Sequence, residues 1–178
     1  MARLTGANVT AAHTEAAKLG RVRPVAIRPF KESEARAVAE WTYEPPFDIY
    51  NGDPSRFEDY LAIDDRGYGF YALANRAEEI IGSCCFGDEA RVTGQVPIEG
   101  VVDLGGGVRP DLVSHGIATD VFPAIVTFAI STFRPMQLRT AIASFNERST
   151  RLCLSAGFSV TRVFDGPGRQ FQELLRTA

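Results

Sequence analysis

The pattern of apolar and polar positions in this chain of 178 residues predicts alternating strands and helices around one central segment, residues 101–130. β-Branched residues and three consecutive glycines over 101–108 predict a buried strand whose backbone is left uncovered by side chains. Arg109-Pro110 ends that strand, 112–118 forms a glycine-containing turn, and apolar residues then recur at helical spacing. The segment therefore predicts a strand, a turn and a helix N-terminus.

The turn before this helix is the first candidate for a binding site. The amide N–H groups of a first helical turn have no partner within the helix, and the helix dipole places partial positive charge there. Such a turn is suited to an anion, and a pyrophosphate is the size of group that it accommodates.

Shorter periodic segments flank the centre, each with its own start or stop signal, such as Asp53 before Pro54 or Gly157 after the last helix. Pro123 lies inside the main helix, where we expect it to kink the axis or remove a backbone hydrogen bond. The predicted elements are strand 25–28, helices 33–41 and 54–63, a hairpin of strands 68–74 and 79–86, strand 101–108, the helix from 117, strand 137–144, helix 146–156, and a closing hairpin of strands 158–164 and 169–175.

Two loops are unusual in composition. Residues 41–51 hold four aromatic residues and two prolines, and this stiff segment cannot continue a helix past Glu44. Residues 87–100 form a polar, glycine-containing loop that is long for a connection and is therefore predicted to line a site. The alternatives are a satellite hydrophobic cluster for 41–51 and a solvated surface pair for Glu89 and Arg91.

Composition narrows the class of protein. An apolar fraction of 45% and a charged fraction of 23% are typical of a soluble globular protein, expected here as one domain over 25–178 after a flexible extension over 1–24. Residues 9–19 of that extension favour a weak helix, and a transit peptide is the less favoured interpretation. A net charge of −3 argues against nucleic-acid binding.

Neither a membrane span nor a secretory signal is predicted, so we expect a cytoplasmic protein. Three cysteines, two of them adjacent at Cys84 and Cys85, indicate packed thiols rather than disulfides or metal ligands. The two histidines, His13 and His115, offer no convincing base for a Ser or Cys triad, and no Walker or dinucleotide-binding loop is present.

The run Gly-Gly-Gly-Val-Arg-Pro-Asp-Leu-Val-Ser-His-Gly-Ile-Ala resembles the acetyl-CoA-binding signature of the GNAT superfamily of N-acetyltransferases. Gly116 and Ala118 match that signature, whereas its leading basic or Gln position falls on Val113, with Arg109 and His115 as alternative polar contacts. A second run, residues 146–158, resembles the family pattern Asn-x-x-Ala…Tyr-x-x-x-Gly-Phe, and it does so through Asn146, Gly157 and Phe158.

The resemblance implies an α/β (α+β) GNAT fold: a mixed, mostly antiparallel sheet of about seven strands, flanked by helices, whose fourth and fifth strands splay to admit the pantetheine arm. It implies acetyl-CoA as co-substrate and direct attack of a primary amine, from a small molecule or peptide, in a ternary complex. No metal is expected, because no His, Cys and Asp cluster has metal-ligand spacing. A catalytically weak or inactive acyl-CoA-binding module is the alternative, and a homodimer stays open. The implied cofactor contacts are Leu104, Gly106, Val108, Val113, Ser114, His115, Gly116, Ile117, Ala118, Asn146 and Ser149, and the substrate contacts are Tyr43, Glu44, Tyr50 and Glu89.

Two residues are candidates for proton transfer. Asp103 lies in an apolar strand, where an ionised carboxylate must be paired or face a site; it is either the general base or a structural carboxylate, with Glu44 and Glu89 as alternative bases. Cys153 occupies the position of the family's Tyr, the usual acid toward the CoA thiolate. The other interpretation of Cys153 is a packing residue. In that case water, Ser149 or Ser155 would protonate the CoA thiolate, or the thiolate would leave unprotonated.

Overall fold

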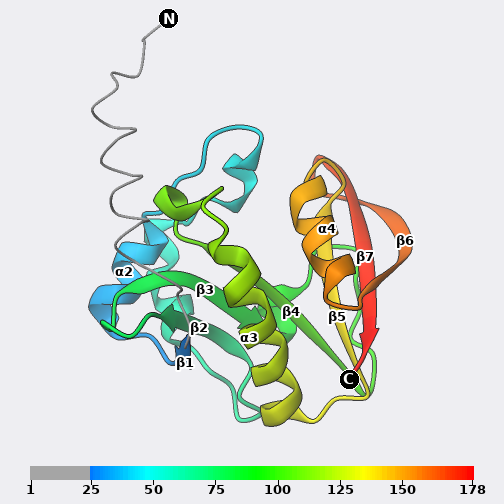
Figure 1. Ribbon diagram of the computed structural model, residues 1–178, viewed down its shortest axis with the longest axis horizontal. Helices are drawn as coiled ribbons and strands as arrows, with labels where there is room; N and C mark the ends of the chain where they lie inside the picture. Colours follow the sequence, from blue (N-terminus) through cyan, green and yellow to red (C-terminus); the bar gives the residue numbers. More distant parts are fainter. Residues whose placement is uncertain (1–24) are drawn as a thin grey trace, which may run out of the picture.

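A seven-stranded mixed sheet forms the centre of the computed structural model, which describes residues 25–178 (Figure 1). The predicted extension 1–24, with its helix over 9–19, lies outside the described residues. Strand order is β1-β2-β3-β4-β5-β7-β6, antiparallel throughout except for the parallel pair β4–β5. The strands are β1 (Ala26–Arg28), β2 (Gly69–Ala74), β3 (Ile80–Phe86), β4 (Val101–Val108), β5 (Gln137–Ala143), β6 (Ser159–Gly166) and β7 (Arg169–Thr177).

Helices α2 (Glu32–Ala39), α3 (Ile117–Phe133) and α4 (Glu147–Ser155) agree with the predicted positions within a few residues. The helix predicted over 54–63 is instead an irregular 3-10 segment, Pro54–Leu61, although Asp53 caps it by accepting a hydrogen bond from the amide of Ser55 at 2.9 Å. Among the described residues, no helix is long and apolar enough to cross a membrane. Further 3-10 turns cover Phe47–Tyr50, Gly87–Ala90 and Pro110–Leu112.

Helices cover both faces of the sheet, so side chains of alternate strand residues enter different clusters. On β2, Tyr71 and Leu73 join the main core under α3, whereas Ala72 joins a second cluster with α2. Helix α4 lies on the α3 side and contributes Cys153 to the main core. On β4, Val102 and Leu104 face the α3 side, which leaves the opposite face to Asp103 and the alternate glycines.

The predicted splay of the fourth and fifth strands is present. β4 pairs with β5 only from Val101↔Gln137 to Asp103↔Arg139, and beyond this point β4 continues against β3 while β5 continues against β7. We call this divergence the splay, and Figure 1 shows α3 and α4 flanking it. Pro123 lies within α3 without ending it; because proline has no N–H, it provides no helical donor for the carbonyl of Thr119.

The short edge strand β1 is joined to α2 by an ion pair. Both guanidinium Nη atoms of Arg28 lie 2.8 Å from the Glu34 carboxylate, which also accepts the amide of Lys31 at 2.9 Å and so caps the helix. The hydrogen bonds from Arg28, outweighing the effect of burial, lower the pKa of Glu34 to about 2.

We predict that Glu34→Gln lowers the free energy of unfolding at pH 7 by about 1–2 kcal/mol, the ion pair being partly open to solvent. The folded-state pKa of about 2 lies below the unfolded value of about 4.3, so the pair's contribution is complete above both values and is lost as the pH falls from about 5 toward 2. Urea unfolding across this range should show the wild-type and variant curves converging. Glu32→Gln, which removes only an exposed pair with Arg36, is the control; parallel curves for Glu34→Gln would contradict the prediction.

Candidate active site

Beyond the splay, one edge of β4 has no strand partner. The amide of Arg109 donates to the carbonyl of Ile81 on β3 at 2.9 Å, so strand alternation directs the backbone groups of Val108, Gly106 and Leu104 toward β5. β5 pairs with none of these three residues. A side chain at position 106 would meet Ile125 at 3.0 Å and the carbonyl of Ser83 at 3.1 Å, so glycine at this position keeps the strand close to α3.

The predicted anion turn follows directly on this edge. Ser114 and Gly116 both have left-handed φ angles, +71° and +79°, which turn the chain into the N-terminus of α3. The amide of Thr119 is the first to bond back, to the carbonyl of Gly116, so the amides of Ile117 and Ala118 precede the helical hydrogen-bond ladder. The buried side chain of Leu112 anchors the turn in the core.

The two polar residues expected to assist at Val113 are placed differently. Arg109 binds the Asp111 carboxylate at 2.7 Å and the carbonyl of Ile80 at 3.0 Å, so its charge is engaged away from the turn. His115 stays at the turn, with Nδ1 3.0 Å from the carbonyl oxygen of Val113.

The edge of β5 and the start of α4 form the other side of the splay. Asn146 is buried; its Oδ1 accepts the amide of Ser149 at 3.2 Å, which caps α4 as predicted, and its Nδ2 donates to the hydroxyl of Tyr50 at 3.3 Å. The hydroxyl of Ser144, just after β5, is buried and has no hydrogen-bond partner among the described residues. An orphaned buried hydroxyl indicates an unfilled polar contact at this point.

Residues 41–51, which we call the lip, contact both sides of the splay. The hydroxyl of Tyr43 donates to the carbonyl of Val108 at 2.9 Å, and burial raises the pKa of Tyr43 to about 12, so it remains a neutral donor. On the other side, the ring of Phe47 meets that of Phe145 at 5.5 Å. Trp41 belongs to the cluster around α2, in keeping with the packing alternative for the first residue of the lip, and Glu44 is exposed.

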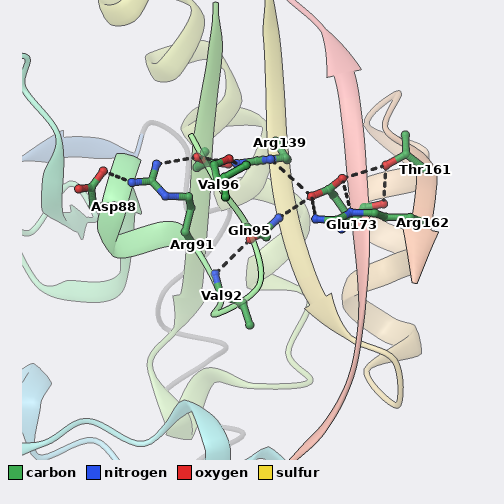
Figure 2. Close-up of polar contacts among 10 residues, drawn as sticks. Asp88, Arg91, Val92, Gln95, Val96, Arg139, Thr161, Arg162 and Glu173 are labelled. Atoms are coloured by element: carbon green, nitrogen blue, oxygen red, sulfur yellow. Dashed lines mark hydrogen bonds and ion pairs between the residues drawn. The ribbon is translucent and has the colours of Figure 1, made fainter. Parts of the chain in front are cut away.

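A network of ion pairs crosses the sheet where β4 and β5 meet (Figure 2). Arg139 is only 1% exposed and donates to both carboxylate oxygens of Asp103, at 2.5 and 3.1 Å. Its other Nη lies 3.5 Å from Glu173 on β7, which in turn accepts from Arg162 on β6 at 3.0 Å. Burial acts to raise the pKa of Glu173, but hydrogen bonds from Arg162 and Gln95 and the charge of Arg139 lower it overall.

The same network holds the loop over 87–100. Arg91 pairs with Asp88 and donates to Asp103 at 3.0 Å, Gln95 donates to Glu173 at 2.9 Å, and Arg139 donates to the carbonyl of Val96 at 2.8 Å. Figure 2 shows this loop crossing in front of the strands. Arg91 is therefore not the surface partner of Glu89.

These contacts bear directly on Asp103. Both of its oxygens are occupied by guanidinium groups, which fits the alternative of a structural carboxylate. Arg139 and Glu173 were not among the residues predicted from the sequence. The signal available for them was a charged residue at an inward-facing position of an alternating strand.

Glu89 is an exposed carboxylate beside the glycines of β4. The thiol of Cys85 donates to the carbonyl of Glu89 at 3.5 Å, and burial, assisted by the charge of Glu89, raises the pKa of Cys85 to about 12. A side chain at Gly105 would lie 3.0 Å from the sulfur of Cys85, so that thiol packs directly against the strand. Among the described residues, no ion pair includes the Glu89 carboxylate, and its charge acts on Cys85, which packs against Gly105 of β4.

Cys153 is part of the main hydrophobic core and is 4% exposed. Burial raises its pKa to about 12, and its surroundings are those expected of a packing residue. Between residues 25 and 178, no group of three or more His, Cys, Asp or Glu side chains could hold a metal ion.

This combination of a splayed parallel pair, a bare glycine strand and a turn at a helix N-terminus agrees with comparisons at the sequence level. Residues 25–159 match the family model of the acetyltransferase (GNAT) domain. The chain belongs to the GNAT acetyltransferase family. No curated protein sequence matches the chain.

Solved structures show the same GNAT fold. Aminoglycoside acetyltransferase AAC(6')-Ib in complex with coenzyme A and kanamycin has a TM-score of 0.68 at 18% identity, covering 86% of this chain and 94% of that one. A chimera of spermidine N-acetyltransferase SpeG from Vibrio cholerae and hSSAT gives 0.68 at 13% identity, with 86% and 95% covered. A GnaT-family acetyltransferase from Bordetella pertussis gives 0.67 at 19%, with 86% and 95% covered.

We predict that Asp103→Leu and Arg139→Met each destabilise this GNAT protein by about 3 kcal/mol or more, because each removes the closest partner of a buried charge and leaves that charge only its contact with Glu173 or Arg91. The double variant should lose less than the sum of the two, with a coupling of at least about 1.5 kcal/mol by urea unfolding. The exposed pair Glu32–Arg36 provides the control cycle, with an expected coupling below about 0.5 kcal/mol. Additive losses at Asp103 and Arg139 would show that the pair does not act as a unit.

Proposed function

We propose that the protein is an acetyl-CoA-dependent N-acetyltransferase that acetylates a primary amine of a small molecule or peptide by direct attack in a ternary complex. The observation that carries this proposal is the row of backbone groups at Leu104, Gly106 and Val108, without a strand partner, leading into the turn at Gly116. Family membership and solved GNAT structures that contain acetyl-CoA or coenzyme A support it.

The residues present fit such a ligand. The bare edge of β4 offers donors and acceptors for the amides of a pantetheine arm. On the β5 side, the hydroxyl of Ser144 has no partner among residues 25–178, and it lies two residues before Asn146, which is bonded to Tyr50. Acetyl-CoA would supply an acyl group already activated as a thioester. The pyrophosphate would be held by the turn at the start of α3, through Val113, Ser114, His115, Gly116, Ile117 and Ala118, with Ser149 nearby on α4.

The acceptor amine must lose a proton before it attacks. We assign this step to Glu89, acting directly or through a water molecule, because its charge acts on Cys85 beside the glycine strand and no ion pair among residues 25–178 includes its carboxylate. Asp103 is held by two arginines and acts as a structural residue. Since Cys153 is buried in the core, the thiolate leaves without it and is protonated from solvent, as the ordinary thiol pKa of about 8.5 permits.

The lip forms the acceptor side of the proposed site. Tyr43 and Tyr50 lie at the two arms of the splay, and Glu44, next to Tyr43 in the chain, is exposed. Aromatic rings and a carboxylate on one loop are groups that bind an ammonium ion. The solved relatives act on amines, an aminoglycoside in one case and spermidine in another, which supports an amine acceptor here.

An acyl-CoA-binding module with little or no turnover is the second candidate. Two observations favour it: the signature's basic position is Val113, and the position of the family's acid is the buried Cys153. Release of coenzyme A above the hydrolytic background, in the presence of an amine panel, would exclude the module.

We predict that Gly116→Glu abolishes binding of both acetyl-CoA and desulfo-CoA, with affinity reduced at least about 100-fold, because a carboxylate would enter the anion turn and strain a left-handed residue. Isothermal titration calorimetry provides the measurement. Gly168→Glu is the matched control: Gly168 has a similar φ of +68° and equally open surroundings, but lies in the β6–β7 turn. Failure of wild-type protein to bind either ligand would contradict the proposed function.

We predict that Glu89→Gln lowers kcat for amine acetylation about 100-fold and leaves the affinity for acetyl-CoA unchanged, because it removes the base and no cofactor contact. Activity of the variant should recover as the pH rises toward the pKa of the amine, since solvent then removes the proton. Glu99→Gln, another exposed carboxylate of the same loop, is the control. Retention of full activity by Glu89→Gln would rule out this assignment.

A further inference from the structure

We propose that Arg148, on α4, binds the diphosphate of the acyl-CoA and supplies the positive charge that Val113 cannot. The inference rests on the proposed function. Arg148 is not one of the positions that match either family signature, so its role is not implied by the resemblance. The positive charge that binds the diphosphate then comes from α4, on the opposite side of the splay, and not from the turn after β4.

The need for such a residue follows from the turn itself. Val113 brings no charge, and Arg109 is engaged with Asp111 and the carbonyl of Ile80. Backbone amides and the helix dipole together provide only about half of a positive charge, while a diphosphate carries at least two negative charges. A full cation within reach of the turn is therefore expected to contribute strongly to affinity.

Arg148 is within that reach. Its Nη1 donates to the hydroxyl of Ser114 at 2.7 Å, across 34 positions of sequence and from one arm of the splay to the other. Ser114 is a left-handed residue in the centre of the anion turn. The guanidinium that touches Ser114 is thus already positioned next to the amides that open α3.

The charge of Arg148 is also available. The neighbouring carboxylate, Glu147, is engaged by Arg151 at 3.1 Å, and Arg148 forms no ion pair within the described part of the chain. Most other arginines of the structure are neutralised by a carboxylate, as Arg91, Arg109 and Arg139 illustrate. An exposed guanidinium without a carboxylate, fixed on an uncharged hydroxyl, is a cation ready for an anion.

Phe47 of the lip orients this cation. The Arg148 guanidinium lies 5.3 Å from the centre of the Phe47 ring, and stacking on an aromatic face reduces its freedom while leaving the edge donors open. Because Phe47 belongs to the lip, the same arginine contacts the proposed acceptor side and the proposed phosphate turn. Its planar set of donors can bridge two phosphate oxygens, which a serine hydroxyl alone cannot do.

The test compares acetyl-CoA with one ligand that lacks only the 3′-phosphate and with one that lacks the whole 3′-phospho-ADP group. We expect Arg148→Gln to weaken acetyl-CoA binding about 10- to 100-fold by calorimetry. The same loss should be seen with 3′-dephospho-acetyl-CoA, which keeps the diphosphate, and no loss with S-acetylpantetheine, which has none. Val113→Arg, added to Arg148→Gln, should restore most of the affinity, because it returns a cation to the position that the family signature uses.

Arg151→Gln is the matched control on the same helix; it removes an equal charge that does not touch the turn, and its affinity for acetyl-CoA should stay within about twofold of wild type. Equal weakening of S-acetylpantetheine by Arg148→Gln would overturn the proposal in favour of a structural role. A loss confined to ligands with a 3′-phosphate would overturn the diphosphate assignment, and full acetyl-CoA affinity in Arg148→Gln would overturn the inference while leaving the proposed function intact. Absence of acetyl-CoA binding in wild type would overturn both.

Discussion

The buried ion pair between Asp103 and Arg139 joins the two halves of the sheet at the one place where they meet. β4 and β5 share only three residue pairs, and this pair of side chains lies at the last of them. A guanidinium that is 1% exposed cannot be left without its carboxylate, so the register of β4 against β5 is fixed here. Each strand then follows its own antiparallel partner, and the bare edge of β4 is the consequence.

The network around this pair also positions a loop that local sequence does not fix. Arg91, Gln95 and the carbonyl of Val96 each attach the loop over 87–100 to buried charges on the sheet. Glu89, at the start of that loop, is thereby kept next to Cys85 and the glycine strand. Arg91 and Gln95, which have no part in the proposed chemistry, thus determine where the proposed base lies. Asp103 contributes to this position by binding Arg91.

At the open end of the splay, three segments distant in sequence meet through polar side chains. Tyr43 of the lip reaches the carbonyl of Val108, Tyr50 reaches Asn146, and Arg148 reaches Ser114. The groups that these side chains contact are the ones that the family resemblance assigns to the cofactor. Cofactor and acceptor sides of the proposed site are therefore in direct contact, and binding on one side is expected to affect the other.

The sequence by itself determined most of the fold. Apolar periodicity, glycines and caps such as Asn146 are local signals, and they located nearly every strand and helix; the 3-10 segment Pro54–Leu61 was predicted as a helix because its cap and first proline suit both. Local spacing around Gly116 also sufficed to indicate the family. Only the tertiary structure decided the surroundings of Asp103, whose partner lies 36 residues away, and the position of Arg148 beside Ser114, because contacts between side chains far apart in sequence leave no periodic trace in the chain.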